Sequence, residues 1–150
     1  MKRMIPFGLD QNQFSQRLIR SLEDLSDHSI QCIRGFLLQP IPAAVQSVEF
    51  QLFVDAENCG APSIWAYFVD DNLKSSERSR EVALNLDELE EMDDRYFTDF
   101  KFSGVNLMAD VLKSWFADCW WKAGGGDFGV PAVLDVHDGF GDRRSIQLTK

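Results

Sequence analysis

The stretch GVNLMADVLKSWFADCWWKAGGG, residues 104–126, decides the fold. Apolar side chains recur in it at the three- and four-residue spacing of a helix, and they are Val105, Met108, Val111, Leu112, Trp115, Phe116, Cys119 and Trp120. Polar residues such as Asp110, Lys113 and Asp118 fill the other side, so the pattern predicts an amphipathic helix over about 104–123. The three glycines then end this helix, because the left-handed position that follows a helix favours a residue without a Cβ atom.

Strand patterns lie on both sides of this helix in the sequence. Residues 46–55 alternate between apolar and polar side chains, and residues 64–69 are rich in aromatic and β-branched ones. The two segments predict an antiparallel hairpin. After the helix, residues 131–137 and 143–148 predict a second hairpin around a turn that is rich in Asp and Gly. The helix therefore has a sheet on which its apolar face can pack.

The segment between the first hairpin and the helix has two interpretations. Residues 82–86 alternate between apolar and polar side chains, which predicts a third strand of the sheet. The longer run 81–92 also contains many residues that favour helices, so a helix is the alternative.

The first part of the chain predicts another helix and then a strand. Asp10 is a good N-cap, and apolar residues follow it at helical spacing, namely Phe14, Leu18, Ile19, Leu22 and Leu25. This spacing predicts a helix over 11–26. For residues 29–39 we expect a strand, because Gly35 lies inside the segment and Pro40 follows it.

These elements together predict an α+β fold, with a mostly antiparallel sheet and two main amphipathic helices packed on one face. The chain has 150 residues, the length of one ordinary domain, so we expect residues 1–150 to form a single domain. Its hydrophobic fraction of 45%, with twelve Phe and four Trp, is sufficient for a core.

Charge and cysteine content narrow the partners and the compartment. The formal net charge of −9 argues against binding to nucleic acids or anionic membranes, since both need a concentrated basic surface. The three cysteines are an odd number without close spacing, so a disulfide framework is not expected. No apolar run has the length of a membrane span, and the first residues lack the pattern of a signal peptide. We therefore expect a cytoplasmic protein.

An acidic run at residues 87–94 is the main candidate for a binding surface. Its six carboxylates belong to Asp87, Glu88, Glu90, Glu91, Asp93 and Asp94. A patch of one charge attracts partners of the opposite charge, so the run predicts a surface for a basic protein. A solvated turn or helix end is the alternative, because a charge run is often only an exposed surface.

Trp121 is the second candidate for partner binding. It falls outside the apolar stripe of its helix, whereas Trp115 and Trp120 lie within it. An exposed Trp beside Asp118 would be an interface anchor, since Trp is enriched among the residues that dominate binding energy. The alternative is a ring that lies against the loop at 124–128.

The residue patterns give little support to catalysis or metal binding. No two cysteines are neighbours, and the Asp residues around Gly139 lack the order of a calcium loop. Cys119 and His137 would suit a nucleophile and its base, yet Cys119 lies on the apolar face of its helix, which favours a buried thiol. We therefore expect no metal, no cofactor and no catalytic residue.

Part of the last third of the chain resembles a known class of bacterial proteins. The resemblance lies in Trp115-Phe116-Ala117-Asp118-Cys119-Trp120, then in Ala123-Gly124-Gly125, Phe128, Pro131 and His137-Asp138. These residues resemble the C-terminal signature of small proteins of the immunity class that is associated with polymorphic toxins. The resemblance implies a cytoplasmic protein that neutralises a toxin by binding it, without a cofactor.

Our leading hypothesis is a non-catalytic interaction protein of the immunity or antitoxin type, which binds a protein partner such as a basic toxin or nuclease domain through its acidic surface. The alternative is a small enzyme or ligand-binding domain with a pocket near His137, Asp135 and the loop at Asp127, because loops often hold functional residues. A homo-oligomer that forms through exposed aromatic residues is a third hypothesis.

Overall fold

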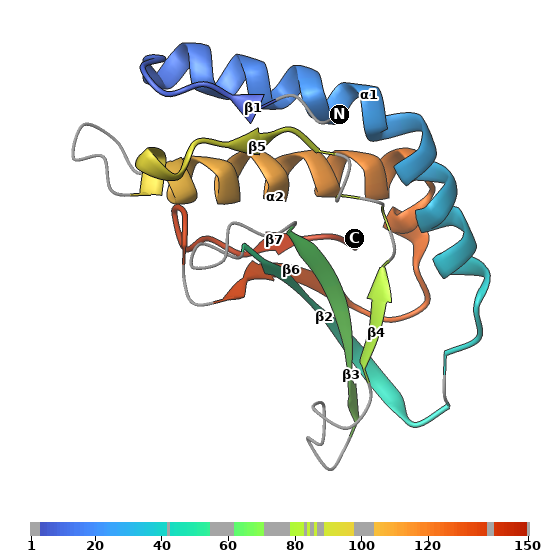
Figure 1. Cartoon of the computed structure of the whole chain (residues 1–150). Helices are drawn as coiled ribbons and strands as arrows, with labels where there is room; N and C mark the ends of the chain where they lie inside the picture. The colour runs from blue at the N-terminus through green and yellow to red at the C-terminus, as the bar shows by residue number, and fades with distance from the viewer. Residues whose placement is uncertain are drawn as a thin grey trace.

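The computed structural model describes residues 4–41, 43–54, 62–70, 79–82, 84, 86, 89–97, 104–137 and 140–149. Its elements are β1 (Met4–Ile5), α1 (Gln11–Leu38), β2 (Val45–Phe53), β3 (Ser63–Asp70), β4 (Ser79–Val82), β5 (Glu91–Met92), the 3-10 helix η3 (Asp94–Phe97), α2 (Gly104–Lys122), the 3-10 helix η4 (Gly125–Asp127), β6 (Ala132–Val136) and β7 (Ile146–Gln147). Figure 1 shows their arrangement.

Helix α1 begins at the predicted N-cap and is far longer than predicted. The Asp10 carboxylate accepts from the Gln13 amide at 2.8 Å, and the Gln13 side chain accepts from the Asp10 amide at 3.0 Å, so the two form a capping box. The strand predicted over 29–39 is wrong, because α1 continues to Leu38. Ile33 and Phe36 extend the buried stripe, while Gly35 lies on the exposed side.

The first hairpin is as predicted. β2 pairs antiparallel with β3, in a register that places Phe50 opposite Ala66 and Leu52 opposite Ile64. All four side chains are fully buried, so alternate positions of both strands face the core. The second predicted hairpin is present as the antiparallel pair β6 and β7, with Leu134 opposite Ile146.

The main sheet has five strands in the order β4-β3-β2-β6-β7. β2 and β6 pair in parallel, and every other neighbouring pair in this sheet is antiparallel. The α+β class with a mostly antiparallel sheet is therefore confirmed. A third strand does lie beside β3, but it covers 79–82 rather than the predicted 82–86, and the alternative helix over 81–92 is wrong because β5 lies inside that run.

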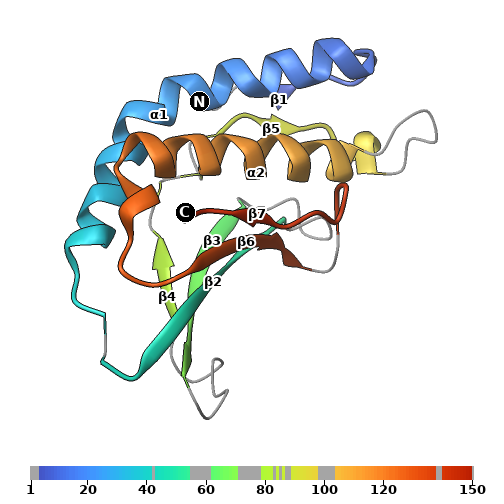
Figure 2. The ribbon, with the colours of Figure 1, turned by 180° about the vertical axis from the view of Figure 1, so that it is seen from behind.

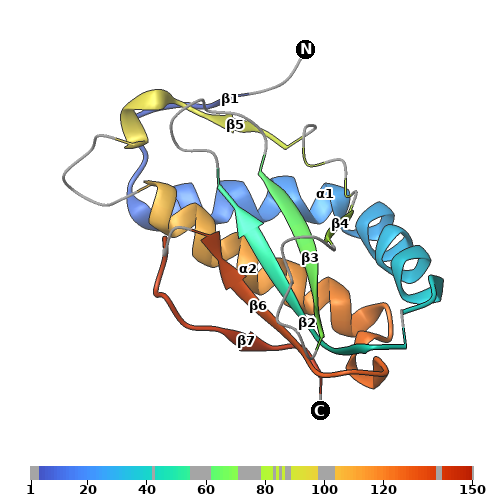
Figure 3. The ribbon, with the colours of Figure 1, turned by 90° about the horizontal axis from the view of Figure 1, so that it is seen from below.

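Both helices lie on the same side of this sheet, as Figure 3 shows with the sheet in front of them. Figures 1 and 2 show α2 next to the sheet and α1 alongside α2, running in the same direction. The core forms where they meet: the Phe50 ring lies 5.0 Å from the Trp120 ring and 5.7 Å from the Phe36 ring, centroid to centroid. Over the described residues, neither helix combines the length and the apolar character that a membrane span needs.

A second sheet, which the sequence did not predict, lies beside the first half of α1 (Figure 1). It consists of β1 and β5 in parallel, with Met4 opposite Glu91. Tyr96 in η3 secures the segment before α1, because its buried hydroxyl donates to the Pro6 carbonyl and accepts from the Leu9 amide at 3.2 Å. The chain around the acidic run is thus held against the N-terminal segment.

Candidate functional site

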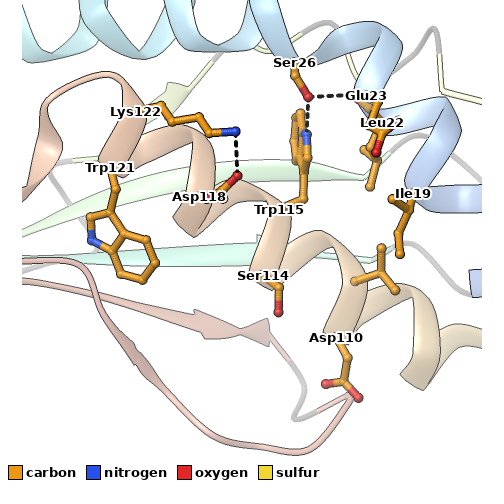
Figure 4. A pocket seen from close by; sticks show the side chains of 11 residues that line it. Ile19, Leu22, Glu23, Ser26, Asp110, Ser114, Trp115, Asp118, Trp121 and Lys122 are labelled. Atoms are coloured by element: carbon orange, nitrogen blue, oxygen red, sulfur yellow. Dashed lines mark hydrogen bonds and ion pairs between the residues drawn. The ribbon is translucent and has the colours of Figure 1, made fainter. Parts of the chain in front are cut away.

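A groove of about 650 Å³ lies along the line where α1 and α2 meet (Figure 4). α1 forms one wall with residues that share one helical face, namely Ile19, Leu22, Glu23 and Ser26. α2 forms the other wall with three apolar side chains, Val111, Trp115 and Trp121, and four polar ones, Asp110, Ser114, Asp118 and Lys122. The lining is mainly apolar, and its charged groups are Glu23, Asp110, Asp118 and Lys122.

A hydrogen bond joins the two walls at the floor of the groove. The Trp115 indole N–H donates to the Ser26 hydroxyl at 2.9 Å, and that hydroxyl donates to the Leu22 carbonyl at 3.0 Å (Figure 4). Leu22 is fully buried beneath them. The polar groups at the floor therefore already have partners, and the hydrogen bond between Trp115 and Ser26 holds the two walls together.

Trp121 and Ile19 are the large apolar side chains that the groove exposes. The Trp121 side chain is 49% exposed and that of Ile19 is 43% exposed. The Trp121 indole N–H donates to the Leu148 carbonyl at 3.1 Å, the same acceptor that the buried Trp120 uses. A Cβ atom at Gly126 would lie 3.9 Å from the Trp121 ring, so one edge of the ring lies near the loop while much of the side chain is exposed. Its role as an interface anchor stays a prediction.

Three carboxylates and one ammonium group lie among the apolar side chains of the groove. Glu23 is exposed, and Asp118 forms an exposed ion pair with Lys122 at 3.0 Å, a contact that raises the pKa of the Lys122 ammonium group. Asp110 accepts from the Asp142 amide at 2.9 Å and lies 3.8 Å from the Lys113 ammonium group. The groove lining therefore has three carboxylates against one ammonium group.

Lys113 lies on the polar side of its helix in the sequence pattern, yet it is only 3% exposed. The turn before β7 covers it: its ammonium group donates to the Asp142 carboxylate and to the Arg144 carbonyl at 2.8 Å. The hydrogen bond from Lys113 lowers the pKa of the Asp142 carboxyl below its usual value. A buried cation thus fastens the second hairpin to α2.

The acidic run is only partly described, and two of its carboxylates have partners within the chain. Asp87 and Glu88 lie outside the described residues, Glu91 lies in β5, and Asp94 opens η3. The Glu90 carboxylate accepts from the Arg17 guanidinium group of α1 at 3.1 Å, and its side chain is 17% exposed. Glu90 is therefore partly neutralised.

Asp93 is the second paired carboxylate of the run. It accepts from two guanidinium nitrogens of Arg95, each at 2.9 Å, and its amide donates to the Ile5 carbonyl at 3.1 Å. The hydrogen bonds from Arg95 lower the pKa of the Asp93 carboxyl to about 2. None of the described residues of the run lines the groove. The Arg17 side of α1, which Glu90 contacts, points nearly opposite to Ile19, because the two positions are two residues apart on the helix.

The groove does not lie near His137, where the alternative hypothesis places a pocket. His137 is exposed beyond β6, and its ring lies 4.4 Å from the Phe53 ring, centroid to centroid. The Asp135 carboxylate accepts a hydrogen bond from the Ser145 hydroxyl. Neither residue lines the groove, and neither does Asp127.

Cys119 is poorly suited to act as a nucleophile. It is 2% exposed, and burial together with the Asp118 charge raises its thiol pKa to about 11, so little thiolate exists at neutral pH. A different pair, Cys32 and His28, lies on the surface of α1 with Sγ 3.5 Å from Nε2. The sequence pattern did not predict this contact, although two residues four positions apart lie side by side on the surface of a helix. The described part of the chain contains no group of three or more His, Cys, Asp or Glu residues that could hold a metal ion.

Comparison of the chain with protein-family models, with curated proteins and with solved structures finds no match.

Proposed function

We infer that this protein is a non-catalytic binding protein of the immunity or antitoxin type, which acts in the cytoplasm and neutralises a basic toxin or nuclease domain by binding it. The observation that supports this most is Trp121, an exposed aromatic ring that is fixed by a hydrogen bond to Leu148 and lines a groove together with three carboxylates. The resemblance of the C-terminal third to immunity proteins agrees with it.

An aromatic side chain that is already fixed in the free protein binds a partner at a lower entropic cost than a mobile side chain does. Immobilising a side chain at an interface costs about 0.5–1.5 kcal/mol, and part of that cost is already met when the ring has a partner in the free protein. Trp121 has such a partner in the Leu148 carbonyl at 3.1 Å. Its exposed face is therefore ready to bury apolar surface of a partner.

The charge of the chain selects the kind of partner. With a net charge of −9, the protein attracts cationic partners at long range and repels polyanions. A basic toxin or nuclease domain has the complementary charge, because a domain that binds an anionic substrate does so through a basic surface. Electrostatic attraction of this kind raises the association rate more than it raises the affinity.

The protein encoded by the gene immediately upstream provides the test. Expressed alone, it should stop growth, and co-expression with this chain should restore growth and yield a complex of the two proteins. Unchanged growth arrest and no complex, with this chain folded and in excess, would overturn the proposed function.

Charge reversal then tests whether the acidic run contributes. We expect reversal at Glu88, Glu90 and Glu91 to slow association and to flatten its dependence on salt. Because Glu90 pairs with Arg17 at 3.1 Å, the stability of the variant should be measured alongside. Unchanged association kinetics would show that the acidic run is not the binding surface.

A further inference from the structure

We propose that the groove between α1 and α2 is the docking site for an amphipathic α-helix of the partner, with basic residues on both sides of its apolar face. The proposal rests on the proposed function and specifies where and how the partner binds. It commits to one occupant, a basic amphipathic helix of another protein.

The dimensions of the groove suit a helix. Its α2 wall runs from Asp110 to Lys122, which at 1.5 Å per residue extends for about 18 Å, or roughly three turns of a bound helix. The lining residues repeat at intervals of three and four on both walls, and the walls run in the same direction (Figures 1 and 4). A third helix laid between them would interdigitate with these rows as neighbouring helices do.

The exposed apolar side chains of the lining supply contact area for the apolar face of such a helix. Ile19 and Trp121 are each almost half exposed, and Figure 4 shows them reaching the groove from different helices. Between them, the Trp115 indole N–H is satisfied by Ser26 at 2.9 Å, so the floor does not need a polar ligand. Helices that bind in grooves of this kind use apolar residues at three- and four-residue spacing.

The carboxylates of the groove lining favour a basic partner over a second copy of this chain. Glu23, Asp110 and Asp118 line the groove, with Lys122 as the ammonium group among the lining residues. Asp118 pairs with Lys122 at 3.0 Å and Asp110 lies 3.8 Å from the Lys113 ammonium group, which leaves Glu23 as the carboxylate most open to a partner. In a symmetric dimer through this face, the carboxylates of one copy would approach those of the other, which like charges disfavour. Lys and Arg residues beside the apolar face of a partner helix would instead pair with them.

Three synthetic peptides of about 18 residues, each close to five helical turns, test the proposal against the full chain. The first has leucines at helical spacing and lysines elsewhere, the second has the same composition in an order without an apolar face, and the third has glutamates in place of lysines. Amide chemical shifts of the labelled protein report binding. The first peptide should give saturable shifts over residues 19–26 and 110–122. Equal binding of the scrambled peptide, or shifts confined to other surfaces, would overturn the proposal.

Matched variants separate the groove from general acidity. Glu23 lines the groove, whereas its neighbour Asp24 is exposed on α1 outside it. We expect Glu23→Lys to weaken binding of the first peptide by about fivefold or more, and Asp24→Lys by about twofold or less, because exposed charges are screened within about 8 Å in physiological salt. Equal effects would indicate non-specific attraction and would contradict the proposal.

An apolar pair of variants provides the second control. Ile19→Ser should weaken binding of the first peptide, whereas Leu38→Ser, which alters a side chain that is 86% exposed at the end of α1, should not. The same variants in the growth assay distinguish this proposal from the proposed function. Full neutralisation by Ile19→Ser and Glu23→Lys would refute the groove and leave the function standing. A dimer of the unliganded chain that Ile19→Ser dissociates would identify a second copy as the occupant and overturn the proposal.

Discussion

Gly125 and Gly35 have opposite surroundings and should respond oppositely to alanine. A Cβ atom at Gly125 would lie 2.2 Å from the buried Trp120 indole, whereas one at Gly35 meets nothing within 4 Å. Gly125→Ala should therefore lower the free energy of unfolding by about 2–3 kcal/mol through overpacking. Gly35→Ala, at an exposed helical position, should raise it by roughly 0.5–1 kcal/mol, since alanine is the better helix former.

Chemical denaturation of both variants measures the two changes. Gly129→Ala is the control for a glycine-to-alanine change outside a helix. A Cβ atom at Gly129 also meets nothing within 4 Å, and the residue lies outside both helices. A Gly125→Ala variant as stable as the native protein would contradict the packing described around Trp120.

Single residues differed in how well the sequence predicted them. Trp121 was recognisable because it falls off the apolar stripe of α2, a property of local spacing alone. The burial of Lys113 was not, since its partners Asp142 and Arg144 reach it only after the chain has folded back. The same holds for Glu90, whose partner Arg17 lies on another element. The local sequence pattern predicts on which side of a helix a residue lies, but not which other segments of the chain cover that side.

At the scale of whole elements, α1 shows how propensity and packing compete. Gly35 and the following prolines favoured a strand over 29–39, yet a glycine in a helix costs only about 1 kcal/mol. Burial of a side chain such as Ile33 or Phe36 contributes about 1.5–3 kcal/mol each, which exceeds that cost. The apolar stripe therefore continues through Gly35, and the helix ends only where Pro40 approaches.

Lys113 fastens the second hairpin to α2, and this contact can be tested. Lys113→Ala should lower the free energy of unfolding by about 1–3 kcal/mol, because it removes a buried stem and the donor for the Arg144 carbonyl. Lys122→Ala, whose side chain is 62% exposed in an exposed ion pair, should leave stability nearly unchanged.

The same contact predicts a pH dependence. The pKa of Asp142 is lowered in the folded protein by its hydrogen bond from Lys113. A lowered pKa stabilises the fold above the ordinary carboxyl range, and this contribution disappears as the pH falls through the folded value. The stability difference between native protein and Lys113→Ala should therefore narrow in acid. A difference that stays constant from neutral to strongly acidic pH would contradict the pairing.

The whole molecule bears a charge that should keep it monomeric. At pH 7 the formal net charge is −9, and the sequence pI is about 4.6. Light scattering should show a monomer at neutral pH, with association growing as the pH approaches the pI and the repulsion falls. A salt-independent dimer at pH 7 would instead favour the homo-oligomer hypothesis.

The general architecture was predictable from the sequence, but the pairing between distant segments was not. Periodicity of two and of 3.6 residues marked the first hairpin, α2 and the second hairpin, and these suffice for the α+β class. The parallel pairs β2 with β6 and β1 with β5 have no local signal, because each joins segments far apart in the chain. The groove escaped prediction for the same reason, since Ile19 and Glu23 become a wall only when α2 lies beside them.

The parallel pairing of β2 with β6 also sets an order of events during synthesis. The β2–β3 hairpin can form early, but β2 then has an unpaired edge of nine residues until Ala132–Val136 leaves the ribosome. Among the residues that the structure describes, the edge strands of the finished sheet are β4 and β7, with four and two residues. Long apolar edges template aggregation, and short ones resist it. We therefore expect nascent chains that stall before residue 132 to aggregate more readily than the finished protein.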